Sequence, residues 1–166
     1  SELLEPIVDA MMRDLLGSKV IQTDDIPVPV QESPHTREGR LWVYLGDRGH
    51  PHIVYRFSPN RQQRWAQEHL RDYHGYLQAD AYTGYDKLYE DRGRIEVGCW
   101  AHARRKFFDA QGSDAVRSAA ALQYIRELYR VEDEAKDLSA ENRRRARQER
   151  GEPAHVCRGA APRDTA

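Results

Sequence analysis

Hydrophobic positions follow a helical period at the beginning of the chain. Between residues 2 and 16 apolar side chains recur as doublets that lie four positions apart. These doublets are Leu3, Leu4, Ile7, Val8, Met11, Met12, Leu15 and Leu16. The spacing predicts an amphipathic helix, which Gly17 and Ser18 would end. We therefore expect residues 1–18 to form a helix that leads into the domain, in a chain that is a piece of a longer protein.

Three β-rich runs follow this helix. Val20 and Ile21 predict a strand that enters a pair of aspartates, with Pro27 and Pro29 marking its end as an edge or an exit. Residues 31–39 have the composition of a loop. Beyond them, the runs 41–45 and 53–57 flank a segment rich in glycine, which predicts a β-hairpin.

Helices and strands alternate in the next part of the chain. A helix is expected after Ser58 or Asn60, either of which could cap it. The expected elements after that helix are a strand in "GYLQAD", a short helix or turn over 84–91, a strand in "RIEVGCW", a helix in "AHARRKFFDA" and an amphipathic helix over 118–138.

The resulting order is a helix followed by β-β-β-α-β-α-β-α. This is the order of a ribonuclease-H-like α/β fold, with a mixed sheet of about five strands and helices on its faces. We expect residues 19–138 to form such a domain without its C-terminal part. Residues 139–166 are polar and arginine-rich, which predicts a basic tail with a frayed helix to about Arg150 and then disorder.

Composition restricts the classes of function. The 26 basic and 27 acidic side chains give a formal net charge of −1, so any contact with nucleic acid depends on local patches or on other parts of a longer protein. Two cysteines form no disulfide framework and fit a reduced cytosol. No run approaches the roughly 20 apolar residues of a membrane span, so no membrane partner is expected.

Two aspartates stand at the ends of predicted strands. Asp24 follows "VIQT" and Asp80 follows "YLQA". The first and fourth strands of a ribonuclease-H-like sheet are neighbours, so the two carboxylates would lie close together and could hold Mg²⁺. Gly84 would then let the chain turn away. The alternative is that each aspartate only caps a turn or the next helix.

Three stretches resemble the catalytic domain of insertion-sequence-66 family (TnpC-type) DDE transposases. "VIQTDDIPVPV" is similar to the family's first-aspartate motif, "YLQADAYTGYDKLYE" to its second-aspartate motif, and "GCWAHARRKFFDA" to its C-W-A-H-x-R-R-K-F block. The resemblance runs from about residue 1 to 150. It implies that Asp24 and Asp80 are the first two catalytic, metal-binding aspartates. Asp25 stands where the family has Glu, and the alternative that Asp25 is the ligand stays open.

The resemblance also implies the reaction. The family uses Mg²⁺ or Mn²⁺ for hydrolysis at the ends of the mobile element and for attack of the 3′-hydroxyl on target DNA. The expected partners are therefore DNA and either a second copy or the full-length transposase, in the bacterial cytoplasm and at the nucleoid. The family's third carboxylate, in a D-N-N-x-x-E motif, is absent from this sequence. We expect the isolated chain to be inactive or nearly so.

The "CWAHARRK" block suggests further site residues. Cys99 and His102 would lie near the active site, as the resemblance implies; the alternative for Cys99 is a small buried side chain on a strand. Arg104, Arg105 and Lys106 could hold DNA phosphates or simply be a solvated helix face. A zinc site would need His155 and Cys157 as well, and these lie in the tail that does not resemble the family.

The sequence changes character from Gly151 onward. We expect that a frameshift or a premature stop in an insertion element could account for the change. The rival interpretations are a non-catalytic remnant that binds full-length transposase or DNA, and a ribonuclease-H-like nuclease with an unrecognised carboxylate.

Overall fold

The structure is a computed structural model that describes residues 3–32, 34–90 and 93–156, with side chains as far as Gly151. The chain divides into two compact units, Ser1–Cys99 and Trp100–Ala166. The domain expected over residues 19–138 therefore spans the boundary between the two units.

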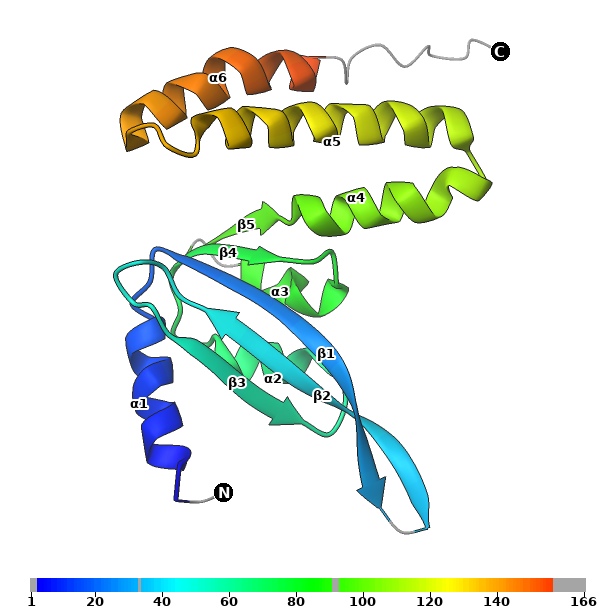
Figure 1. The fold of residues 1–166 in the computed structure, drawn as a ribbon. Helices are drawn as coiled ribbons and strands as arrows, with labels where there is room; N and C mark the ends of the chain where they lie inside the picture. Colours follow the sequence, from blue (N-terminus) through cyan, green and yellow to red (C-terminus); the bar gives the residue numbers. More distant parts are fainter. Residues whose placement is uncertain (1–2, 33, 91–92, 157–166) are drawn as a thin grey trace. The chain divides into compact units, whose positions relative to one another are not determined.

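A five-stranded sheet forms the centre of the first unit (Figure 1). Its strands are β1 (Val20–Glu32), β2 (His35–Leu45), β3 (Ile53–Ser58), β4 (Gly75–Ala79) and β5 (Arg94–Gly98), in the order β3-β2-β1-β4-β5. The β1–β2 and β2–β3 pairs are antiparallel, and the β1–β4 and β4–β5 pairs are parallel. The predicted ribonuclease-H-like mixed sheet is confirmed, as is the predicted neighbourhood of the first and fourth strands.

One face of this sheet carries the hydrophobic core. Because side chains alternate across a strand, Ile21, Trp42, Tyr44 and Leu77 point to the same side, and all four are fully buried. The core also takes in side chains from α1 (Glu5–Leu15), α2 (Gln63–His69), the 3₁₀ turn η1 (Thr83–Tyr85) and α3 (Asp86–Tyr89). Burying each large apolar side chain contributes roughly 1.5–3 kcal/mol, so this face holds the unit together.

The first two strands are longer than the sequence predicts. β1 continues through Pro27 and Pro29, which pair with Arg40 and Glu38 of β2. The predicted strand exit is therefore wrong, and so is the predicted loop over 31–39, since residues from His35 onward belong to β2. β4 pairs with β1 only over residues 20–22, so the rest of β1 is an edge strand, where a proline nitrogen on the open side interrupts no ladder.

The start of α2 also differs from the prediction. The helix follows Gln62, which makes no side-chain cap. The Ser58 hydroxyl instead accepts a hydrogen bond from the Trp42 indole N–H at 2.8 Å and donates to the Asn60 carbonyl at 2.6 Å. Asn60 Oδ1 accepts from the Trp65 indole N–H at 2.9 Å. Asn60 Oδ1 also accepts the backbone N–H of Gln62 at 3.2 Å. The Ser58 side chain therefore serves Trp42, while Asn60 holds both Trp65 and the residue that precedes the helix.

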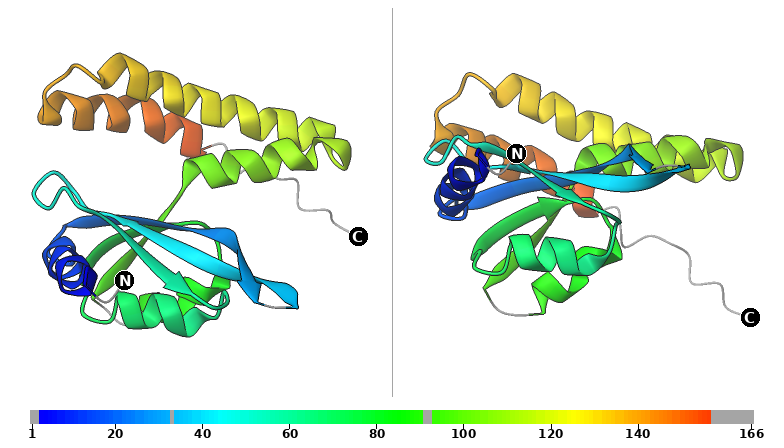
Figure 2. Two further views of the ribbon diagram at one scale, coloured as in Figure 1. Left: turned by 60° about the horizontal axis from the view of Figure 1, so that its bottom comes forward. Right: turned by 90° about the horizontal axis from the view of Figure 1, so that it is seen from below.

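The second unit consists of helices α4 (Trp100–Asp109), α5 (Ala115–Ala135) and α6 (Ala140–Val156), with a 3₁₀ turn η2 (Ala110–Gly112) between the first two. Asp114 caps α5 by accepting the Arg117 N–H at 3.0 Å. Helices α5 and α6 lie side by side (Figure 2), and Arg147 donates two hydrogen bonds of 2.7 Å to Glu132.

The predicted helices over "AHARRKFFDA" and 118–138 are confirmed by α4 and α5. Helix α6 extends beyond Arg150, where the sequence predicted that the helix would fray, and the rest of the tail, residues 157–166, lies outside the described residues. None of the described helices has both the length and the apolar character that crossing a membrane requires.

Candidate functional site

The register between β1 and β4 aligns the two aspartate motifs. Ile21 pairs with Leu77, and Gln22 pairs with Gln78. The segments "IQTD" and "LQAD" therefore run side by side in the same direction, and each aspartate stands two residues beyond the last aligned pair. Because the side-chain period of a strand is two, the side chains of both aspartates lie on the same face of the sheet as those of the two glutamines.

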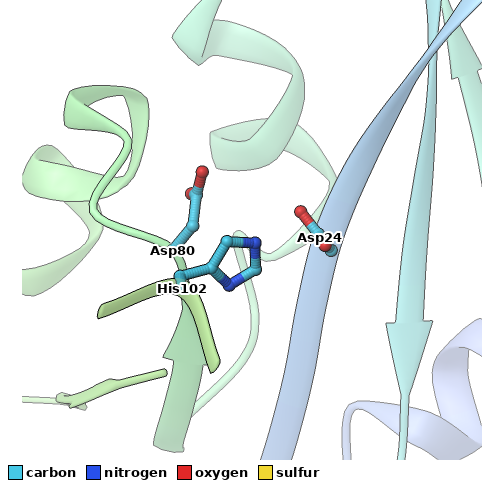
Figure 3. A group of neighbouring side chains, drawn as sticks. All are labelled: Asp24, Asp80 and His102. Carbon is cyan, nitrogen blue, oxygen red and sulfur yellow. The ribbon is translucent and has the colours of Figure 1, made fainter. Parts of the chain in front are cut away.

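The carboxylates of Asp24 and Asp80 come together at this point. An oxygen of Asp24 lies within 4.8 Å of an oxygen of Asp80, and both residues are half-buried (Figure 3). Asp24 Oδ1 accepts the Asp25 backbone N–H at 2.8 Å, and Asp80 Oδ1 accepts the Tyr82 backbone N–H at 3.1 Å. The turn-capping alternative is thus also realised at Asp80, which fixes its own carboxylate while capping the turn.

Asp25 has a different environment from Asp24. Its side chain has no exposed area, and it points to the core side of the sheet, where its strand partner is Trp42. Arg40 donates to Asp25 Oδ2 at 3.2 Å, and Arg61 donates through Nε at 2.9 Å and through Nη2 at 2.7 Å. A buried carboxylate needs such paired donors to remain ionised, and here two guanidiniums supply them.

Arg61 is a site residue that the sequence reasoning missed. Its Nη2 also donates to Asp80 Oδ2 at 3.2 Å, so one guanidinium links the carboxylates of Asp25 and Asp80. The guanidinium lies 3.9 Å from the centre of the Tyr82 ring, and the Tyr82 hydroxyl donates to the Arg61 carbonyl. No motif indicated Arg61, because its relation to the strand ends depends on how the loop between β3 and α2 folds.

The charge of Arg61 is secured by its partners. Burial by itself would lower the pKa of the Arg61 guanidinium, but the hydrogen bonds and negative charges of Asp25 and Asp80 outweigh burial and raise the pKa above its ordinary value. Arg61 therefore stays a cation at the site under all ordinary conditions.

Gly84 lies in the turn that the sequence predicts, but a positive φ is not what requires glycine there. Among the described residues only Gly75 has a glycine-favouring backbone, with φ of +150°. Gly84 is buried, and a Cβ added there would lie 2.1 Å from the Tyr82 ring. The absence of a side chain at Gly84 therefore lets the Tyr82 ring pack closely beside the site, within the 3₁₀ turn η1 that follows Asp80.

The remaining predicted site residues lie on either side of the unit boundary. Cys99 ends the first unit as a half-buried free thiol. His102, also labelled in Figure 3, belongs to α4 of the second unit. Arg104, Arg105 and Lys106 are exposed on the same helix, as a role in phosphate binding would require. Of the further zinc ligands considered, Cys157 lies outside the described residues, and the His155 side chain is not described.

The donor set suits a hard divalent cation. The two half-buried carboxylates, one within β1 and one directly after β4, offer oxygen ligands, which Mg²⁺ and Mn²⁺ prefer. Asp24 and Asp80 would hold such an ion, which would relieve the repulsion between the two like charges. Asp25 would not, since both of its oxygens already accept hydrogen bonds from arginines.

A mixed sheet in this order, with carboxylates at the ends of its central parallel pair, defines a ribonuclease-H-like domain of the DDE transposase class. The family described as "Transposase IS66 family" matches residues 1–156. The chain therefore belongs to this family of transposases. The match extends beyond the position near residue 150 at which the sequence resemblance was expected to end.

Three curated proteins of Sinorhizobium fredii are similar to the chain. "Uncharacterized protein y4hP" is 30% identical over 173 residues, which cover 90% of this chain and 31% of that protein. "Uncharacterized protein y4jD" is 30% identical over 90% of this chain and 32% of its own length, and "Uncharacterized protein y4qI" is 29% identical over 89% and 30%. The chain thus spans about a third of the length of these relatives.

Proposed function

We propose that this chain is part of the catalytic domain of a DNA transposase, in which Asp24 and Asp80 hold a divalent metal ion for DNA strand cleavage and strand transfer. The alignment of "IQTD" with "LQAD" across the β1–β4 pair carries the proposal, since it brings the two carboxylates together just beyond the last aligned pair. The family match supports the same reaction.

The protein's own groups would prepare this site in three ways. The Tyr82 backbone N–H fixes the orientation of the Asp80 carboxylate, and the Asp25 backbone N–H does the same for Asp24. The buried pairing of Asp25 with Arg40 and Arg61 keeps a third negative charge out of the metal site. The bound ion would activate the attacking hydroxyl and stabilise charge on the leaving oxygen.

The third carboxylate of the DDE class would come from outside this chain. Glu127, Glu132 and Glu134 on α5 lack the family's motif around them, and each of them pairs with an arginine of its own unit. We therefore infer that the chain alone is inactive or nearly so, because a two-metal site that loses a ligand loses much of its charge stabilisation.

DNA would be the substrate, both as the ends of the mobile element and as the target. Arg104, Arg105 and Lys106 are the candidate phosphate contacts, supported by their exposure on α4. Cys99 and His102 stay candidate neighbours of the active site on the strength of the family resemblance. The expected bacterial nucleoid location follows from the same substrate.

Association with a second copy or with longer transposase is part of the proposal. The sheet face opposite the core carries Ile53, Tyr55, Phe57, Tyr76 and Ile95, each about half exposed. Apolar residues gathered on one face favour a partner surface over permanent contact with water.

A calorimetric titration with Mn²⁺ tests the metal site. The wild-type chain should bind the ion, and Asp24→Asn and Asp80→Asn should each abolish binding, while the exposed control Asp72→Asn should bind as the wild type does. Asp25→Asn should retain binding, because its oxygens face the arginines; loss of binding there would make Asp25 the ligand instead.

An activity assay tests the expected inactivity. Incubation of supercoiled plasmid with the chain and Mn²⁺ should give no nicked product. Nicking that disappears in Asp80→Ala would show that the two aspartates are sufficient, and would overturn the inference that a third carboxylate comes from elsewhere.

A further inference from the structure

Arg61 holds its two carboxylate partners unequally. It makes three hydrogen bonds of 2.7–2.9 Å with the oxygens of Asp25 but only one contact with Asp80, at 3.2 Å. Hydrogen bonds between charged groups are strongest near 2.7–2.9 Å, so the Asp25 end is the tight one. The contact with Asp80 is the weaker one and the easier to exchange.

Burial strengthens this asymmetry. The Asp25 side chain is fully enclosed, whereas the Asp80 side chain is 21% exposed and the Arg61 side chain 35% exposed. Charged pairs out of water interact more strongly than pairs that water screens. The Tyr82 ring and hydroxyl restrain Arg61 further, through its guanidinium and its carbonyl. Arg61 is therefore anchored at Asp25 and reaches Asp80 only with its outer nitrogen.

The contact between Arg61 and Asp80 reduces the repulsion between the carboxylates of the site. Arg61 is shared between Asp25 and Asp80, while Arg40 pairs with Asp25 and with Glu38. Without an ion, the Asp24 and Asp80 carboxylates repel each other, and Arg61 offsets that repulsion. A divalent cation bound between them would take over this task and would itself repel the nearby guanidinium.

We propose that Arg61 is a positioning residue that acts as a stand-in counterion for Asp80 and competes with the divalent cation for it. Metal binding breaks the Nη2–Oδ2 contact, while the bonds to Asp25 keep the guanidinium at the edge of the site. This inference rests on the proposed function, since it requires that Asp80 be a metal ligand.

Calorimetric Mn²⁺ titration of Arg61→Met, with Arg40→Met as matched control, tests the competition. Both substitutions remove one arginine from the buried Asp25, but only Arg61→Met frees Asp80. Arg61→Met should bind Mn²⁺ about two- to fivefold more tightly than the wild type, the size expected from removing one partly exposed ion pair. Arg40→Met should bind as the wild type does.

The outcomes separate the two proposals. If Arg61→Met binds Mn²⁺ no more tightly than Arg40→Met while Asp80→Asn still abolishes binding, the competition is wrong and the metal site stands. If no binding depends on Asp80, both the metal site and the competition are wrong.

A measurement on the wild-type chain covers the case in which Arg61→Met fails to fold. Side-chain N–H signals of Arg61, assigned by comparison with Arg61→Lys, can be followed by NMR during a Mg²⁺ titration. The Nη2 signal should shift in step with the Asp80 carboxyl signal, and the Nε signal should stay constant because its bond to Asp25 persists. An Nη2 signal that stays constant while the Asp80 carboxyl signal shifts would overturn the proposal.

Discussion

The side chain of Gln22 on β1 donates a hydrogen bond of 2.8 Å to the side chain of Gln78 on β4. These residues form the last aligned pair of the two parallel strands, and each stands two positions before a carboxylate of the candidate site. The amide–amide bond therefore closes the β1–β4 pair just before the strands diverge. It fixes the register on which the approach of Asp24 to Asp80 depends.

A double-mutant cycle with Gln22→Ala and Gln78→Ala measures this bond. We expect a coupling of about 0.5–1 kcal/mol in the free energy of unfolding, as is usual for a hydrogen bond between neutral groups near water. Urea unfolding of the wild type, both single variants and the double variant gives the coupling. Additive effects within error would mean that the amides do not hold the strands together.

Much of the fold was predictable because buried apolar side chains and polar side chains alternate along the strands of the sheet. Ile21 and Leu77 mark the core side, and the aspartates three residues further on follow the same pattern in both strands. The neighbourhood of Asp24 and Asp80 followed once the order of elements indicated a ribonuclease-H-like sheet. The same alternation places Asp25 on the core side with Ile21, which is a physical reason to prefer Asp24 as the ligand.

The parts that sequence patterns missed depend on contacts between distant segments. The continuation of β1 through Pro27 and Pro29 is decided by pairing with β2, which composition does not reveal. Arg61 reaches two carboxylates 36 and 19 positions away along the chain. Both separations are longer than the elements that hold these residues, so no pattern within one helix or strand could have indicated it.

Gly84→Ala should disturb the site through Tyr82. The added methyl would lie 2.1 Å from the Tyr82 ring, which must move and carry the stacked Arg61 guanidinium with it. We expect a loss of about 1–3 kcal/mol in the free energy of unfolding, typical of overpacking. Urea unfolding followed by circular dichroism measures it.

Gly98→Ala is the matched control for this substitution, since Gly98 lies on β5 and an added Cβ there meets no atom within 4 Å. It should change stability by less than about 0.5 kcal/mol. Equal losses in the two variants would show that the tight contact with Tyr82 is not what makes Gly84 necessary.

Ser58→Ala should destabilise the core more than its small size suggests. Trp42 and Ser58 are both fully buried, and the serine hydroxyl accepts the indole N–H. Its removal leaves a buried donor without this partner, which costs about 1–3 kcal/mol. Ser113→Ala, at an exposed hydroxyl that donates to the Ala110 carbonyl, should cost less than about 0.5 kcal/mol. Unfolding followed by tryptophan fluorescence compares the two variants. Similar losses in the free energy of unfolding would mean that the hydrogen bond to Trp42 is not what makes Ser58 important.

Stability should depend on pH through His69. Burial, assisted by the positive charge of Arg56, lowers the pKa of His69 to about 4, against an opposing effect of Glu68. Its Nδ1 is joined to the buried Tyr44 hydroxyl by a hydrogen bond of 2.8 Å. In the unfolded chain the pKa returns to about 6.5, so the unfolded state binds more protons between pH 6.5 and 4. The stability that the neutral imidazole contributes is fully present above that window and is lost as the pH falls through it.

The two pKa values give a loss of about 2 kcal/mol between pH 7 and pH 5, from a cost of about 1.4 kcal/mol per unit of pKa shift. Urea unfolding at both pH values measures the loss. Carboxylates also titrate toward low pH, so the comparison that isolates His69 is with His69→Gln, which keeps a polar partner for Tyr44 and cannot be protonated. His69→Gln should lose about 2 kcal/mol less than the wild type over this interval, while the exposed control His74→Gln should follow the wild type. If His69→Gln has the same pH dependence as the wild type, folding leaves the pKa of His69 unchanged, and burial beside Arg56 does not hold the imidazole in its neutral form.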